Sequence, residues 1–477
     1  MDLQKKSIKI NVVLNIIRVI GTILIPLCVT PYIARVLGVT NMGKINFGNA
    51  VVEYFSLLAS LGIYSYAVKE GTARRNSRHE IDQFASEIFR LNLFTTIIAF
   101  AIFLLCIRYI PQFFQYRLII LMQAANIVFT TLGAEWVYGI YEDYIYITVR
   151  TLVIQACAMV GVFAGVKNPK DIYLYLLINM LSGFSLSLSN HIRSKKYCRI
   201  NPLGAKINMR QIKPIMYIFF STVASTIYTN IDITMIGVIR GDYPVGIYSM
   251  AVKICGVFKQ IIFAGIDVTM PRLSYMAKNN INAYYRFLSR IVYIVLLVVV
   301  PLISGAIIQR KNIIWLLLGD AYSSAELSLA ILFIAVLFAT AAYLVMHTML
   351  LPLGEEKILL SATLFGSGVN LVLNSIMIPT TGITGAAIAT VLSEGSVFFV
   401  SFWRIRNKVY VQITPKWIMV ISISNTVMIG WMLIIKIVVR QRIIEIALSA
   451  IGGIVIYFML VLILGQSEIE KFKRSEI

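Results

Sequence analysis

The sequence predicts an all-α polytopic membrane protein, and three observations lead to this fold class. Of the 477 residues, 58% are hydrophobic and only 14% are charged, and the mean hydropathy is +0.81. Soluble domains are about half apolar and about a quarter charged. The apolar residues gather in stretches of about 20, the length at which a helix crosses a bilayer. No polar stretch between them is long enough to form a soluble domain.

Fourteen apolar stretches qualify as membrane-spanning helices. The first follows Lys5, Lys6 and Lys9, as the core of a signal peptide would, but it is too long and lacks a small-residue cleavage site. We therefore expect it to be a retained helix. The predicted spans cover residues 10–34, 43–68, 86–107, 117–139, 146–166, 171–191, 214–239, 244–270, 291–308, 325–350, 358–378, 382–403, 416–437 and 443–464.

The distribution of Lys and Arg predicts the topology. An even number of spans places both termini on one side of the membrane. Loops on that side carry more than twice as many Lys and Arg as the opposite loops, and the richest is 192–213. Positively charged loops stay in the cytoplasm, so we expect both termini there. The net charge of +21 thus follows the topology, and a nucleic-acid-binding face is not indicated.

An internal repeat divides the predicted spans into two halves. At an offset of 203 residues, Gly38 pairs with Gly241, Gly43 with Gly246 and Gly62 with Gly265. The same offset carries the first two spans onto the seventh and eighth. Six spans per repeat make the halves parallel, the arrangement in which transporters bind substrate between repeats. We therefore predict an N-terminal lobe (1–203), a C-terminal lobe (204–407), and a last helix pair with a cytoplasmic tail (408–477).

Several predicted spans carry polar residues three or four positions apart, which places them on one face of a helix. One interpretation is hydrogen bonding between packed helices, a common role of Ser, Thr and Asn in membranes. The other is the wall of a hydrated cavity. The uncharged candidates for such a wall are Asn15, Asn49, Asn370 and Asn374.

Charged residues within the spans point more strongly to a cavity. Placing Arg, Lys or Asp at the centre of a span costs about 2.5–3.5 kcal/mol, so these residues face a cavity or a partner. Arg18 and Lys253 are the candidate cations, one in each half, and buried ion pairs without a ligand are the alternative. Lys259 either lines the cavity or extends its ammonium to the membrane interface. The acidic candidates are Glu53, Asp232, Asp267 and Glu394.

Enzymatic and metal sites are not indicated by the sequence. GVTNMGKI (38–45) departs from a phosphate loop, because Ile45 stands where the Mg²⁺-binding hydroxyl is required. The five cysteines are scattered without a C-x-x-C pair, and the three histidines lie far apart. We therefore expect no cofactor, no metal and no chemistry performed on the substrate.

Four segments carry a resemblance to a known family. They are RVLGVTNMGKINFGNAVVEYFSLLASLGI (35–63), DITMIGVIRGDYPVGIYSMAVK (232–253), IIWLLLGDAY (313–322) and GITGAAIATVLSE (382–394). With them the chain resembles the polysaccharide-transport family, the Wzx-type flippases of the MOP superfamily. These motifs mark the family and not one sugar substrate. The resemblance implies two six-helix lobes plus two further helices, the MOP/MATE-like fold.

The resemblance also implies a function and its partners. It implies that undecaprenyl-pyrophosphate-linked oligosaccharide, an O-antigen or capsule repeat unit, moves from the inner to the outer leaflet of the bacterial inner membrane by alternating access. A polysaccharide polymerase and a chain-length regulator are the implied protein partners, besides membrane lipid. Arg18 and Lys253 would then meet the phosphates, and the Asn rows and Lys259 would line the cavity.

Several alternatives remain open at this point. Glu53, Asp232 and Asp267 either bind a coupling ion or pair with the cations, and Glu394 either binds such an ion in the cavity or lies near the inner interface. Within the same fold, an ion-coupled multidrug exporter is the second reading, although Arg18 and Lys253 would repel cationic drugs. A polysaccharide polymerase or ligase would need a large outward loop, which the sequence lacks. The protein could also be a membrane subunit with a purely structural role. Neutralising these cations would then change its folding but would affect no transport.

Overall fold

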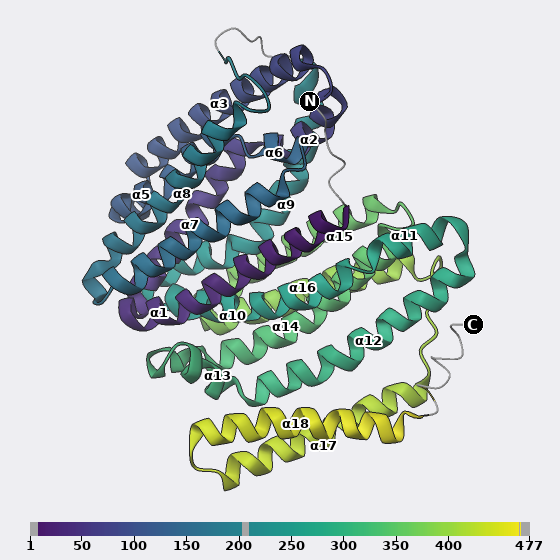
Figure 1. Ribbon diagram of the computed structural model, residues 1–477. Coiled ribbons are helices and arrows are strands. Elements are labelled where there is room, and N and C mark those ends of the chain that lie inside the picture. Colours follow the sequence, from purple (N-terminus) through teal and green to yellow (C-terminus); the bar gives the residue numbers. More distant parts are fainter. Residues whose placement is uncertain (1–7, 203–208, 467, 469–477) are drawn as a thin grey trace. The chain divides into compact units, whose positions relative to one another are not determined.

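The computed structural model describes residues 8–202, 209–466 and 468, which form helices joined by turns, with no strand in this part of the chain (Figure 1). Within a few of these helices, including residues 8–20, only the backbone is described. The chain divides into two compact units, Met1–Gly246 and Ile247–Ile477. This all-helical architecture agrees with the predicted fold class.

Eleven helical stretches of the described residues are long and apolar enough to cross a membrane, so the chain is a multi-pass membrane protein. One of them, Ile25–Arg74, covers the first two predicted spans, and Arg117–Gly133 is apolar but shorter. The total of fourteen spans therefore stays a prediction. Apolar side chains such as Phe94, Ile97 and Leu105 point out of the fold, as expected for helices that face lipid tails.

The first unit is built mainly from long helices. They are α1 (Ile8–Ser60), α2 (Ile63–Arg74), α3 (Arg78–Tyr109), α5 (Arg117–Gly133), α7 (Tyr144–Gly165), α8 (Ile172–Ser194) and α9 (Met209–Arg240), with the short helices α4 (Pro111–Gln115), α6 (Trp136–Ile140) and η1 (Pro169–Asp171) between them. Helix α1 packs against α3, α5, α7 and α9. The Tyr32 hydroxyl on α1 donates to the Val166 carbonyl after α7 at 2.7 Å, which fastens these two helices together.

The second unit begins within α10 (Asp242–Asp267). Its other helices are α11 (Met270–Asn279), α12 (Ile281–Ile308), α13 (Arg310–Leu317), η2 (Asp320–Ala325), α14 (Glu326–Leu344), η3 (Val345–Leu350), α15 (Glu356–Thr381), α16 (Ile383–Ile405), α17 (Pro415–Val438) and α18 (Arg442–Leu464). Helix α16 packs against both α14 and α15, while α17 and α18 run side by side as an antiparallel pair and α17 contacts α12 (Figure 1). The contacts thus group α9 with the first unit. The predicted lobes 1–203, 204–407 and 408–477 stay a prediction.

Two glycines interrupt the helices at equivalent positions of the sequence repeat. Gly38 has φ 78° inside α1, and Gly241 has φ 84° between α9 and α10. Residues with a Cβ rarely adopt this left-handed region, whereas glycine enters it without steric cost. These two breaks separate the helices of each repeat where the sequence predicts a loop.

The second pair of matched glycines lies at close contacts between backbones. A Cβ on Gly43 would lie 1.9 Å from the Asp242 carbonyl oxygen, and a Cβ on Gly246 would lie 2.1 Å from that of Val39. Val39 and Asp242 are themselves related by the offset of 203 residues. The repeat is therefore visible as a reciprocal backbone contact. The third matched pair is not equivalent, because Gly62 precedes α2 with φ 74° while Gly265 lies inside α10.

Candidate functional site

The polar residues of the first unit gather where α1 faces α9. Asp232 on α9 is buried, and Glu53 on α1 is exposed. Tyr54 lies in the electrostatic field of both carboxylates, and its hydroxyl is 3.2 Å from the Thr234 hydroxyl. Thr234 donates to the Asn230 carbonyl, so Tyr54 is the donor to Thr234. This arrangement brings together two acidic candidates, while the candidate Asn49 is exposed on α1.

The candidate cations of this unit are not all described. The side chains of Asn15 and Arg18 lie outside the described residues, although their backbone belongs to α1. Their predicted roles in binding sugar and phosphate therefore stay predictions.

In the second unit, Lys259 on α10 forms an ion pair with Glu394 on α16. The Lys259 Nζ donates to Glu394 Oε1 at 2.8 Å, and the two side chains are 27% and 9% exposed. The Tyr248 hydroxyl on α10 lies 3.2 Å from the Thr390 hydroxyl, one turn before Glu394 on α16. These contacts fasten α10 to α16. The structure therefore brings a candidate cation and a candidate acid together as partners.

A second acidic candidate of α10, Asp267, meets α14 and the segment that follows it. The Tyr343 hydroxyl donates to Asp267 Oδ1 at 2.6 Å, and His347 Nδ1 lies 3.3 Å from the same oxygen. The Phe263, Tyr343 and His347 rings are stacked with centroids 3.8 Å apart in each successive pair. His347 lies in η3, a π-helical turn, and such turns are frequent at functional sites. The structure therefore brings a carboxylate, a phenol and an imidazole together where the end of α10 meets α14 and η3.

The remaining candidates differ in exposure. Asn370 and Asn374 on α15 are buried, and the Asn374 amide donates to Asn370 Oδ1 at 2.9 Å. Lys253 on α10 is exposed, six residues before Lys259. Within the part of the chain that the structure describes, its ammonium forms no ion pair with a carboxylate. Lys253 is therefore the candidate cation of this unit that is not engaged in an ion pair within the described residues.

Tyr54, Tyr343 and His347 were not predicted from the sequence. Tyr343 and His347 are four residues apart and therefore lie on the same face of their helical segment. Both face Asp267, a charged residue on another helix. The spacing of an aromatic hydroxyl and an imidazole inside an apolar stretch is the signal that would have found them. Tyr54 follows Glu53 directly, and its role depends on α9, which the sequence does not reveal.

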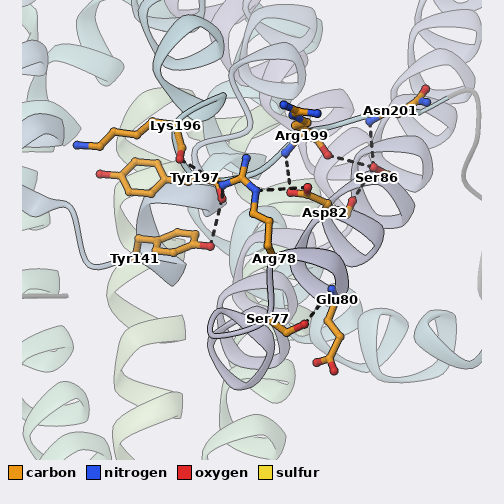
Figure 2. Close-up of polar contacts among 10 residues, drawn as sticks. All are labelled: Ser77, Arg78, Glu80, Asp82, Ser86, Tyr141, Lys196, Tyr197, Arg199 and Asn201. Carbon is orange, nitrogen blue, oxygen red and sulfur yellow. Dashed lines mark hydrogen bonds and ion pairs between the residues drawn. The ribbon is translucent and has the colours of Figure 1, made fainter. Parts of the chain in front are cut away.

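Polar contacts also fix the chain where it leaves α8 (Figure 2). Three side chains of α3, Arg78, Asp82 and Ser86, hold residues 196–201, and we call this arrangement the linker clasp. The Arg78 guanidinium donates to the carbonyls of Lys196 and Tyr197 at 3.3 and 2.6 Å, and Asp82 accepts from the backbone N–H of Arg199 at 2.7 Å. The Asn201 N–H donates to Ser86 Oγ at 2.9 Å. The clasp provides hydrogen bonds to backbone groups that no longer have helical partners once the chain leaves α8.

Aromatic side chains surround the clasp. Tyr141 and Tyr197 are stacked with centroids 4.6 Å apart, and Tyr197 donates to the Asp143 carboxylate, which also accepts from Arg193 at 3.1 Å. Burial, together with the bond to Asp143, raises the pKa of Tyr197 above its usual value. Burial likewise raises the pKa of the Cys198 thiol to about 12. The segment after α8 is therefore an ordered part of the first unit.

Comparison with known proteins relates the chain by sequence to polysaccharide biosynthesis proteins. Residues 8–277, more than half of the chain, match the family described as "Polysaccharide biosynthesis protein". The "Putative O-antigen transporter" of Shigella dysenteriae is 23% identical over 375 residues, which are 78% of this chain and 93% of that protein. The "Probable low-salt glycan biosynthesis flippase Agl15" of Haloferax volcanii is 24% identical over 398 residues, 82% of this chain and 81% of that protein.

Solved structures resemble the fold at low sequence identity. The lipid II flippase MurJ in an inward closed conformation matches with a TM-score of 0.75 and 15% identity, covering 96% of this chain and all of that one. An inward-facing multidrug resistance MATE transporter of the MOP superfamily matches with a TM-score of 0.60 and 16% identity, over 81% of this chain and 98% of that one. The predicted MOP/MATE-like fold is thus confirmed, and the chain belongs to the polysaccharide biosynthesis protein family.

Proposed function

We propose that the protein is a flippase that moves undecaprenyl-pyrophosphate-linked oligosaccharide from the inner to the outer leaflet of the bacterial inner membrane by alternating access. Both termini would lie in the cytoplasm. A polymerase and a chain-length regulator would use the product on the outer side. Membership of the family and relatives described as an O-antigen transporter and a glycan flippase support this proposal.

The observation that carries the proposal is the set of charged and hydrogen-bonding side chains on otherwise apolar helices. A lipid-linked sugar needs a hydrated path for its headgroup, and charged residues in a membrane are costly unless they line such a path or pair. Lys259 is already paired with Glu394, whereas Lys253 is exposed. We therefore assign phosphate binding to Lys253 together with Arg18. Asn49 is exposed and would meet sugar hydroxyls, whereas the buried Asn370 and Asn374 would meet them only after α15 moves.

Ion coupling is the second part of the proposal. Glu53 and Asp232 lie near the same tyrosine, and Asp267 contacts Tyr343 and His347. Either group can take up an ion or a proton and thereby favour one conformation, because a ligand shifts an equilibrium by its differential affinity for the two states. Glu394 would act only after its bond to Lys259 opens.

The test compares variants in liposomes. Leaflet transfer of a fluorescent undecaprenyl-pyrophosphate oligosaccharide would be measured for the wild type, Lys253→Gln and Arg18→Gln. A charge-assisted hydrogen bond contributes about 1.5–3 kcal/mol, so transfer is expected to fall about tenfold or more in each variant. Lys357→Gln, at an exposed position at the start of α15, is the matched control and should transport as the wild type does. Unchanged transfer by folded Lys253→Gln and Arg18→Gln proteins would refute the phosphate assignment.

The multidrug exporter is the competing function, because a MATE transporter shares the fold. Its cationic substrates would be repelled by Lys253 and attracted by Glu53 and Asp232. Export of a cationic dye by the wild type, increased in Lys253→Gln, would favour the exporter over the flippase.

A further inference from the structure

The second unit contains an apolar cavity of about 460 Å³, within the range of ligand pockets. Its walls come from α12, α14 with η3, the end of α16, and the chain between α16 and α17. Its apolar lining includes Val295, Leu337, Leu344 and Phe402. A void of this kind leaves its lining without dispersion contacts on one side, so an apolar occupant stabilises it.

The wall formed by the connecting chain is held in place by hydrogen bonds to one face of α12. Tyr285 donates to the Lys408 carbonyl at 3.1 Å, the Gln412 N–H donates to Ser289 Oγ at 2.9 Å, and the Thr414 N–H donates to the Tyr293 hydroxyl at 2.8 Å. The three α12 residues are spaced four apart and thus share a face. The cavity is therefore preformed and does not depend on a flexible loop.

A cation without a carboxylate partner lies at the cavity wall. Arg406 lines the cavity and is exposed, and its guanidinium lies 5.7 Å from the centroid of the Trp403 ring. Its neighbours are engaged, because Arg404 donates to Ser361 Oγ and Lys408 pairs with Glu355. Within the part of the chain that the structure describes, Arg406 makes no ion pair. Its planar fork matches a phosphate.

Two further groups suit a lipid. Tyr410 lines the cavity and is exposed, and Trp403 near the end of α16 is exposed as well. Trp and Tyr are the residues enriched at the membrane–water interface. The Thr340 hydroxyl is buried in the wall and has no hydrogen-bond partner among the described residues. A buried hydroxyl without a partner is unfavourable, and an ester carbonyl would accept its proton.

We propose that this cavity binds one anionic glycerophospholipid of the cytoplasmic leaflet. One acyl chain fills the apolar chamber, the ester group lies at Thr340, and the phosphate binds Arg406. The predicted topology places the chain between α16 and α17 at the cytoplasmic surface, where anionic headgroups attract cations. An undecaprenyl chain is several times longer than an acyl chain and exceeds the volume of about 460 Å³ that this chamber offers.

Native mass spectrometry of the full-length protein in detergent tests this proposal without requiring transport. The protein would be titrated with phosphatidylglycerol, phosphatidylcholine and undecaprenyl phosphate. We expect phosphatidylglycerol to bind most tightly. Arg406→Gln should weaken its binding about tenfold, by loss of a charged hydrogen bond. Ala341→Leu, which fills the chamber, should weaken both phospholipids.

Arg404→Gln is the matched control, because it removes the same charge two residues away and should leave binding within about twofold. The melting temperature of each variant in detergent shows that it is folded. Equal losses in Arg404→Gln and Arg406→Gln would mean a nonspecific charge effect and overturn the proposal. Tighter binding of undecaprenyl phosphate than of phosphatidylglycerol would overturn it as well, by assigning the cavity to the polyprenyl carrier.

Discussion

Breaking the ion pair between Lys259 and Glu394 should destabilise the second unit. At the observed 2.8 Å, two unit charges attract by about 6 kcal/mol at an effective dielectric constant of about 20. Desolvation offsets part of this attraction. Removing one partner of a buried pair costs about 3–5 kcal/mol, because the other charge is left buried. Since Lys259 is 27% exposed, we expect a loss of about 2–4 kcal/mol for Lys259→Met or Glu394→Gln.

The double variant Lys259→Met/Glu394→Gln shows whether the two charges stabilise each other or are each solvated independently. Unfolding of the purified protein by sodium dodecyl sulfate, followed by circular dichroism, would give the free energies for a double-mutant cycle. The double variant should lose no more than the worse single variant, a coupling of about 2 kcal/mol. The exposed pair Lys311–Glu326, at 3.5 Å, is the matched control and should couple by less than about 1 kcal/mol. Additive losses at Lys259 and Glu394 would refute the pairing and favour two independently hydrated charges.

Three further predictions concern the first unit. Ser77→Ala should cost about 1 kcal/mol of unfolding free energy and Ser77→Gly only a few tenths, because the Ser77 hydroxyl accepts from the Glu80 N–H at the start of α3; equal losses would contradict the cap. Gly43→Ala and Gly246→Ala should each cost about 1–3 kcal/mol in the same titration, since the added Cβ meets backbone; an unchanged unfolding midpoint would refute the contact. Cys198 should resist a maleimide at pH 8, where a thiol with a pKa of about 12 is about one part in ten thousand thiolate, and Arg78→Ala should speed its labelling; fast labelling of the wild type, read by peptide mass spectrometry, would contradict its burial.

The helices and their polar positions could be predicted because both depend on local composition. Apolar stretches longer than a bilayer must satisfy their backbone groups within a helix. The matched glycines predict equivalent positions in the two repeats where the backbone requires glycine. Gly38 and Gly241 have positive φ, and Gly43 and Gly246 lie at the reciprocal backbone contacts. They failed at Gly265, which lies inside α10.

The partners of the polar residues could not be predicted, because they depend on how distant helices are rotated against one another. Lys259 and Glu394 are 135 residues apart, and from sequence Lys259 was equally compatible with snorkelling. The sequence shows three histidines far apart and gives no partner for His347, whereas in the structure a π-helical turn places it beside Asp267. In the sequence, the Lys and Arg of 192–213 indicate topology, whereas the structure shows Arg78 and Asp82 binding the backbone near the start of this loop.

The central claim is that the protein moves a lipid-linked oligosaccharide between leaflets. Liposomes containing only the wild-type protein and a fluorescent undecaprenyl-pyrophosphate oligosaccharide test it most directly, with transfer read by the accessibility of the label to a membrane-impermeant quencher. We expect transfer of this lipid, no transfer of a labelled phosphatidylcholine and no export of a cationic dye. Export of the dye without transfer of the lipid-linked oligosaccharide would contradict the claim.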